Sequence, residues 1–179
     1  MRDYEDVLEW YESIAPSYDE LYSAEQRGKY REAFRYLEDV DGKVVYDLGC
    51  GTSEFLLYLS KKDRIKAYVG LDISLNLLVR AANKAKDLPT PSFFVAGDIS
   101  SPPFREGSGD IAAAFTVLRC RDDLELVTSR MRTLLRRGGR LVVTVLCEEG
   151  ADSIPPGWCR GSFKTLNRRE GMCVEVVDE

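Results

Sequence analysis

An aspartate and two glycines in the segment VVYDLGCGTSEF, residues 44–55, have the types and spacing expected of a ligand-binding loop. Asp47 lies near the end of a run of strand-forming residues, and Gly49 and Gly51 follow it on alternate positions. Glycine at such a turn removes the Cβ atoms that would keep a ligand away from the backbone. In a doubly wound sheet, this turn lies at the carboxyl ends of the strands, where ligands bind.

The carboxylates around this loop indicate which ligand it suits. A dinucleotide-binding loop would follow the pattern G-x-G-x-x-G/A, but the third glycine position holds Glu54. Glu54 and Asp47 would both repel a pyrophosphate, so a nicotinamide oxidoreductase is the least favoured interpretation. A cofactor that has no phosphate and carries a positive charge would instead be attracted.

Four motifs in sequence order resemble the class I S-adenosylmethionine-dependent methyltransferases. The first is Asp47-Leu-Gly49-Cys-Gly51-Thr-Ser53, in which Ser53 replaces the family's usual third glycine. The others are VGLDIS, VAGDIS, and GDIAAAFTVL followed by LLRRGGRLVVTVL. The resemblance covers roughly residues 40–147. It implies an S-adenosyl-L-methionine cofactor, with S-adenosyl-L-homocysteine as product, and cofactor contacts at Asp47, Gly49, Gly51, Asp72, Ile73, Asp98, Ile99 and Thr116.

Single residues of this set also have structural interpretations. Asp72 lies 72 − 51 = 21 residues after Gly51, near the spacing expected for an acid that bonds ribose hydroxyls, but alone it could cap the next helix. Asp98, which the resemblance assigns to adenine, could alone be a turn residue. Asp47 has no such structural role among its apolar neighbours.

Aromatic and basic residues are the candidates for covering the cofactor and binding the methyl acceptor. Tyr11 and Tyr18, in the segment WYESIAPSYDELY, resemble aromatic residues that fold over the cofactor in this superfamily, although core packing explains them equally well. Arg119 and Arg121 follow the fourth expected strand and could hold an anionic acceptor; pairing with Asp122 and Asp123 on a solvated loop is the alternative. No catalytic base is identified.

Composition excludes several other chemistries. The 179 residues include no histidine, which excludes Ser-His-Asp and Cys-His catalysis and histidine-ligated metal. The five cysteines are widely spaced without a C-x-x-C pair, so we expect no metal site, no disulfide framework and mostly buried, reduced thiols. Methyl transfer needs alignment more than proton transfer, so the absence of histidine is no obstacle.

Charge and motif positions bear on RNA and amine acceptors. Residues 1–42 hold 12 acidic and 5 basic side chains, a net of −7, while the remainder is near neutral, unlike a general nucleic-acid binder. Late-helix arginines usually complement the helix dipole, but an RNA-binding stripe is the alternative for Arg130, Arg132, Arg136, Arg137 and Arg140. Ser101-Pro102-Pro103-Phe104 resembles an amino-methylation motif but follows the wrong strand, so we interpret it as structural.

The order of apolar and helical segments predicts an α/β fold. Strand-like segments at 43–48, 67–72, 92–98, 110–117 and 140–146 alternate with helices near 53–62, 74–87 and 123–137, the last capped by Asp122 and ended by Gly138-Gly139. The connection between the third and fourth strands has no clear helix. We expect a doubly wound, mostly parallel Rossmann-like sheet with helices on both faces, preceded by helices over 3–15 and 24–38.

The chain is expected to form one domain, residues 1–179. It would comprise an N-terminal helical arm or lid (1–40), a cofactor-binding core (41–147) and a short C-terminal region (148–179) containing an antiparallel hairpin. Only 179 − 147 = 32 residues follow the fifth strand, so a partner such as an activator subunit could complete the acceptor site. An acidic N-terminus and the lack of a long apolar run predict a cytoplasmic protein that does not use a membrane.

Two classes of function therefore remain open. The favoured one is a methyltransferase whose acceptor is unidentified, with a small molecule preferred and RNA possible. The alternative is a protein that binds the cofactor without catalysis and acts as a scaffold or regulatory subunit in a partner complex.

Overall fold

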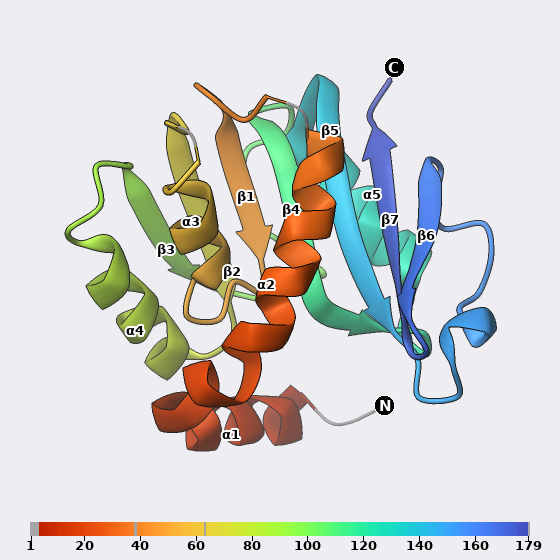
Figure 1. Ribbon diagram of the computed structural model, residues 1–179, viewed down its shortest axis with the longest axis horizontal. Coiled ribbons are helices and arrows are strands. Elements are labelled where there is room, and N and C mark those ends of the chain that lie inside the picture. The colour runs from red at the N-terminus through yellow and green to blue at the C-terminus, as the bar shows by residue number, and fades with distance from the viewer. Residues whose placement is uncertain (1–3, 38, 63, 179) are drawn as a thin grey trace.

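The computed structural model describes residues 4–37, 39–62 and 64–178 (Figure 1). Its centre is a seven-stranded sheet in the order β3-β2-β1-β4-β5-β7-β6. The first five strands pair in parallel, whereas β7 runs antiparallel to both β5 and β6. The strands are β1 (Val44–Leu48), β2 (Ala67–Asp72), β3 (Ser92–Ala96), β4 (Gly109–Arg119), β5 (Leu135–Leu146), β6 (Ser162–Asn167) and β7 (Glu170–Val176). The predicted mostly parallel sheet and its C-terminal hairpin are confirmed.

Helices cover both faces of this sheet. One buried cluster joins the sheet to α2, α3 and α4, and a second joins its other face to α5 and to loops around residues 99–104 and 151–158. The helices are α1 (Tyr4–Ile14), α2 (Tyr18–Leu37), α3 (Glu54–Leu59), α4 (Leu75–Ala85) and α5 (Leu124–Leu134), with 3₁₀ turns η1 (Ala15–Ser17) and η2 (Ala151–Ser153). The central strands are apolar almost throughout because both of their faces are covered.

The N-terminal arm lies at the edge where the parallel strands end. In Figure 1, α1 and the first turns of α2 lie below the arrowheads of β1 and β2, and α2 then crosses one face of the sheet. Helix α2 begins at Tyr18, earlier than the 24–38 expected from hydrophobic spacing, because η1 turns the chain directly from α1 into α2. The arm is therefore placed next to the glycine loop.

The end of α5 differs from the sequence-based expectation. The helix stops at Leu134, and Leu135 already pairs with Gly109 of β4. Its N-cap is Asp123, whose Oδ1 accepts a hydrogen bond from the Leu126 amide at 3.0 Å. The predicted helix end at the glycines and the predicted cap at Asp122 are therefore wrong, because strand pairing competes for residues 135–137.

Four of the five cysteines form disulfides, so the prediction of reduced thiols is wrong for them. Cys120 pairs with Cys147 across the ends of β4 and β5, with Cα atoms 5.1 Å apart. Cys159 pairs with Cys173 of β7, with Cα atoms 5.8 Å apart. Cys50 is free and buried. Wide sequence spacing concealed both pairs because the partners meet only through the order of the strands in the sheet.

In residues 4–37, 39–62 and 64–178, no helix has both the length and the apolar character needed to cross a bilayer.

Candidate functional site

The glycine loop is tied to the end of the neighbouring strand. Gly49 and Gly51 have φ values of +80° and +52°, in the left-handed region that glycine adopts without a Cβ penalty. The amides of Gly49 and Cys50 donate to the Leu71 carbonyl at 2.7 and 2.9 Å. The Gly51 amide donates to Asp72 Oδ2 at 2.8 Å. The loop from β1 is thus held against the end of β2.

Side chains press closely on both glycines. A Cβ added to Gly49 would overlap the side chain of Val117, and one added to Gly51 would lie 2.9 Å from the Tyr18 hydroxyl. Ser53, which replaces the third glycine of the pattern, is also left-handed, with φ 61°. The turn therefore keeps the backbone shape of a three-glycine loop although one of its members carries a side chain.

Asp47 is a buried carboxyl at the end of β1. Its side chain accepts a hydrogen bond from the Tyr68 hydroxyl of β2. Burial raises the pKa of Asp47 to about 7, and the nearby Asp72 carboxylate adds to that rise, although the Tyr68 bond opposes it. A cation placed beside Asp47 would favour its ionised form.

Asp72 connects the loop to the following helix. Besides the Gly51 amide, it accepts the Ser74 amide at Oδ1, 3.0 Å away. Burial raises its pKa despite these backbone bonds. Each carboxylate oxygen has a second lone pair, so Asp72 can still accept from ribose hydroxyls. It therefore orders the loop and remains capable of the predicted ribose contact.

The predicted adenine and ribose neighbours follow the same edge of the sheet. Asp72 pairs with Ala96 at the end of β3, and the Gly97 amide donates to the Asp72 carbonyl at 3.0 Å. Asp98 and Ile99 come next in the chain; Asp98 Oδ1 accepts the Ser100 amide at 2.7 Å, and Ile99 packs partly buried against a core cluster. Ile73, half-buried, lies beside Asp72 in the chain.

Tyr18 of the arm lies against the glycine loop at Gly51, and Tyr11 packs against Tyr18. The rings of Tyr11 and Tyr18 are 6.3 Å apart, and Tyr18 also packs against Tyr22 at 5.0 Å. Burial raises the pKa of Tyr18 far above its usual range, with Tyr11 and Asp72 contributing, so its hydroxyl stays protonated. The predicted lid role of both tyrosines stays a prediction.

Polar contacts fix the arm to the body. Lys84 of α4 contacts Asp19 Oδ2 at 2.8 Å and Glu54 Oε1 at 2.7 Å. Thr52 of the loop donates to Asp19 Oδ1 at 2.5 Å. Burial raises the pKa of Asp19, but hydrogen bonds from Lys84 and Thr52 outweigh it and lower that pKa overall. The arm is therefore attached through a charged contact that includes the glycine loop itself.

A small cavity lies between the arm and the glycine loop. It holds about 20 Å³, and Tyr18, Gln26, Asp47 and Gly49 are among the residues that line it. This is about the space of one water molecule, whereas pockets for drug-sized ligands measure roughly 300–1,000 Å³. A nucleoside cofactor would have to displace side chains such as Val117 and Tyr18 from the two glycines.

The residues proposed for acceptor binding lie apart from this cavity. Arg119 pairs with Glu148 at 2.7 Å, and its amide donates to Asp122 Oδ2. Arg121 is exposed. Neither arginine lines the cavity beside the glycine loop.

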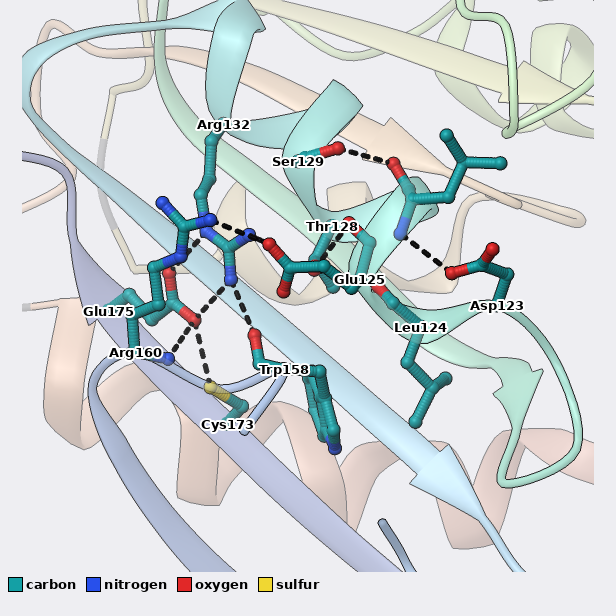
Figure 2. Close-up of polar contacts among 11 residues, drawn as sticks. Asp123, Leu124, Glu125, Thr128, Ser129, Arg132, Trp158, Arg160, Cys173 and Glu175 are labelled. Atoms are coloured by element: carbon teal, nitrogen blue, oxygen red, sulfur yellow. Dashed lines mark hydrogen bonds and ion pairs between the residues drawn. The ribbon is translucent and has the colours of Figure 1, made fainter. Parts of the chain in front are cut away.

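Two arginines of the suggested RNA-binding stripe, Arg132 and Arg136, have carboxylate partners within the protein. Figure 2 shows Arg132 of α5 directed at Glu175 of β7, and the Nε–Oε2 and Nη2–Oε1 distances are 2.8 and 2.9 Å. Arg132 also donates to the Trp158 carbonyl at 2.6 Å, and Arg160 pairs with Glu125. Arg136 pairs with the buried Asp110. Arg132 therefore fastens α5 to β7, whereas Arg136 lies on β5, because the helix ends at Leu134.

The sequence interpretation missed a second group of polar residues near the site. Thr116, which was predicted to contact the cofactor, hydrogen-bonds to Lys29 at 2.6 Å and to Gln26 at 3.1 Å, both of α2. Lys29 also pairs with Glu170 of β7 at 2.9 Å. These partners lie far apart in sequence, so hydrophobic spacing marked α2 as a helix but could not identify its buried lysine.

The described residues fit S-adenosylmethionine by two structural tests. Gly49 and Gly51 keep the loop backbone free of Cβ atoms where Val117 and Tyr18 pack on it, and the carboxyls of Asp47 and Asp72 lie beside it. The donor set consists of carboxylates, as a cationic nucleoside without phosphate requires. The arrangement could hold a sulfonium cofactor through its charge and its ribose hydroxyls.

Comparison with known proteins agrees with this geometry. Residues 46–143, more than half of the chain, match the family described as a methyltransferase domain. The chain is 31% identical over 144 residues to demethylmenaquinone methyltransferase of Lactococcus lactis, a match that covers 77% of this chain and 57% of that protein.

Solved structures show the same fold at lower identity. A Haloferax volcanii methyltransferase in complex with the Trm112 methyltransferase activator superposes with a TM-score of 0.67 and 22% identity, over 75% of this chain and 59% of that one. Geranyl diphosphate C-methyltransferase of Streptomyces coelicolor, bound to S-adenosyl-L-homocysteine, superposes with a TM-score of 0.61 and 17% identity, over 68% and 45%. The chain thus spans about half to three-fifths of the length of these proteins.

Proposed function

Because this chain belongs to the class I S-adenosylmethionine-dependent methyltransferases, we propose that it binds S-adenosylmethionine at the glycine loop and transfers the methyl group to a small-molecule acceptor. One observation carries the proposal: Gly49 and Gly51 are left-handed just after β1, and the Gly51 amide donates a 2.8 Å hydrogen bond to the Asp72 carboxylate. The backbone, Asp47 and Asp72 together form a site that suits a cationic nucleoside.

Different residues of the site would contact different parts of the cofactor. Asp72 and Asp98 would accept hydrogen bonds from the ribose and the adenine, and Asp47 would face the positive charge. Tyr11 and Tyr18 would close over the loop and exclude water. The bound cofactor supplies a methyl group on an already activated sulfonium leaving group. The protein must therefore mainly align an acceptor in line with it, which proximity and orientation achieve.

Calorimetric titration with S-adenosylmethionine and S-adenosylhomocysteine tests this proposal. We expect micromolar binding by the native chain and a loss of at least about tenfold for Asp72→Asn, because a carboxylate that accepts two ribose hydrogens is removed. Asp87→Asn, an exposed aspartate beyond the end of α4, is the matched control. Absence of binding to the native chain, with a cooperative thermal melt, would contradict the proposal.

A small-molecule acceptor is better supported than RNA. Of the arginines in the suggested RNA-binding stripe, Arg132 is engaged by Glu175, Arg136 by Asp110 and Arg140 by the Tyr36 carbonyl at 2.8 Å. Their charges are used within the fold, whereas RNA binding requires charges directed at phosphates. RNA nevertheless remains a prediction with a simple test, nucleic-acid binding with a steep salt dependence.

Arg119 and Arg121 remain the proposed acceptor contacts. If they hold an anionic acceptor, Arg119→Ala should raise the acceptor KM and leave cofactor affinity unchanged. Equal loss of both would contradict that role. Turnover by the isolated chain would also exclude the scaffold alternative, which the methyltransferase relatives do not favour.

An activator subunit is a further part of the proposal. Strand β3 is an edge strand with an open hydrogen-bonding side, and its Phe93 is 57% exposed. An apolar edge of this kind suits strand addition by a partner, and a structural neighbour is a methyltransferase in complex with an activator. Titration with a Trm112-type activator should show binding that Phe93→Lys abolishes; no binding by the native chain would exclude this partner. A cytoplasmic location stays a prediction from the sequence.

A further inference from the structure

Four buried or half-buried polar side chains from separate elements meet beside the cavity. Gln26 and Lys29 come from α2, Thr116 from β4 and Glu170 from β7. We call these four residues the polar cluster. Lys29 Nζ lies 2.6 Å from Thr116 Oγ1, 2.9 Å from Glu170 Oε2 and 2.7 Å from Glu25 Oε1. Three acceptors match the three hydrogens of the ammonium group, so Lys29 is committed to the fold.

Thr116 is the strained centre of the cluster. Its φ is +60°, an outlier for a β-branched residue, and the pairing of β4 with β5 shifts register between Ala114 and Leu118. The Thr116 amide donates to Thr144 Oγ1 at 2.7 Å, and its hydroxyl lies 3.3 Å from Glu170 Oε1. Such strain persists only where neighbours hold the residue in place, and it gathers at functional sites.

The cluster fixes which way the Gln26 amide points. A threonine hydroxyl has one hydrogen and two lone pairs. The hydrogen of Thr116 is directed at Glu170 Oε1, so its lone pairs receive Lys29 Nζ and Gln26 Nε2, the latter at 3.1 Å. Gln26 must therefore donate through Nε2, and its Oε1 faces away from Thr116.

Gln26 Oε1 is a buried acceptor that lacks a hydrogen-bond partner among the described residues. Gln26 is only 7% exposed and lines the cavity together with Asp47 and Gly49. Of the two carboxyl side chains among the described residues that line this cavity, Glu54 already pairs with Lys84, so Asp47 is the one available to a cationic ligand. A polar atom left unpaired in such a place disfavours the empty site and favours a donor that fills it.

We propose that Gln26 Oε1, oriented by the polar cluster, recognises the ammonium group at the amino-acid end of the methyl donor, opposite Asp47. A cationic N–H donor satisfies the free oxygen and the charge of the cavity together, which a neutral ligand would not. The adenosine end would then lie toward Asp72 and Asp98. This inference rests on the proposed function and assigns to α2 a cofactor-recognising residue outside the glycine motif. Lys29, Thr116 and Glu170 are positioning residues.

The test combines one substitution with one change in the ligand. S-adenosylhomocysteine and its deamino analogue, which lacks only the amino group, are titrated calorimetrically into the native chain and into Gln26→Met. Arg31→Met is the matched control, since Arg31 is an exposed residue of the same helix. Thermal melts establish that each variant is folded.

The expected result is a loss that depends on the amino group. Gln26→Met should weaken S-adenosylhomocysteine binding by roughly tenfold or more, the effect of one charge-assisted hydrogen bond, and leave the deamino analogue within about twofold. Arg31→Met should change neither. Equal weakening of both ligands, or no weakening of either, would overturn the inference while leaving the proposed function intact. A native chain that binds neither ligand would overturn both.

Discussion

The glycine-loop region and the β4–β5–β7 region of this protein hold their residues in different ways. The loop region, residues 47–53 with Asp72, is a local structure. Its left-handed glycines turn the chain, and the Asp72 carboxylate accepts a hydrogen bond from the Gly51 amide. The β4–β5–β7 region is held by long-range contacts, including two disulfides and the Lys29–Glu170 pair. A local motif can be recognised in sequence, whereas convergent contacts become visible only once the sheet is assembled.

Among the contacts of the two regions, the disulfides should contribute most to the free energy of unfolding. They close loops over sequence separations of 14 and 27 residues, and loops of this size stabilise by roughly 3 kcal/mol each, so reduction should cost about 6 kcal/mol. Unfolding in urea with and without dithiothreitol measures this loss.

Thiol titration provides the direct control. The unreduced, denatured chain should show one reactive thiol, Cys50, and none in Cys50→Ser. Five titratable thiols without reductant would show that the β4–β5–β7 region is not cross-linked. Of the long-range contacts named above, only the Lys29–Glu170 ion pair would then remain.

The buried ion pair should have the next largest effect. Lys29→Met leaves the carboxylate of Glu170, which is fully buried, without its main partner, and such a loss costs about 3–5 kcal/mol. Lys29→Met with Glu170→Leu should recover much of that stability, because no charge is then left buried. Urea unfolding measures both variants.

Lys164→Met is the matched control for this pair, since Lys164 forms an exposed pair with Glu32. We expect no measurable change in its unfolding midpoint. If Lys29→Met is as mild as Lys164→Met, the polar cluster does not hold β7 to α2.

These two regions also explain how far the sequence could predict the structure. The mostly parallel sheet follows from alternating apolar and helical segments, and the loop follows from Asp47, Gly49 and Gly51, because each is encoded within a few neighbouring residues. Gln26 and Glu170 lie 144 positions apart, and no local pattern marks two residues that share Thr116 as a neighbour. The cysteine pairs were missed for the same reason.

The pH dependence of cofactor affinity tests whether Asp47 of the loop region faces the positive charge. Burial raises the pKa of Asp47 to about 7. This carboxyl therefore stabilises the free chain below about pH 4, and its contribution is lost as the pH rises toward 7. Affinity for a cationic cofactor should change in the opposite direction, because only the ionised carboxylate attracts it.

S-adenosylhomocysteine, whose ammonium group carries the charge, should bind about tenfold more tightly at pH 8 than at pH 6. Calorimetry across this range measures the change, and Asp47→Asn should bind more weakly with a flat profile. A flat profile in the native chain would mean that Asp47 does not face the charge.

The smallest expected effect concerns the start of α5, where a local signal was misplaced by one residue. Asp122 and Asp123 are adjacent exposed aspartates, and spacing alone favoured Asp122 as the cap. In the structure the cap is Asp123, whose Oδ1 accepts the Leu126 amide, while Asp122 Oδ2 accepts the Arg119 amide at 2.7 Å and closes the preceding turn.

Asp123→Ala should therefore cost about 1 kcal/mol in urea unfolding, as the loss of a helix cap does. Asp123→Asn should retain most of that stability, because an amide oxygen can still accept the bond. The loss should also appear as faster hydrogen exchange at the Leu126 amide, which Asp122→Ala should leave protected. Faster exchange at Leu126 in Asp122→Ala, but not in Asp123→Ala, would show that Asp122 is the cap, as the spacing predicted.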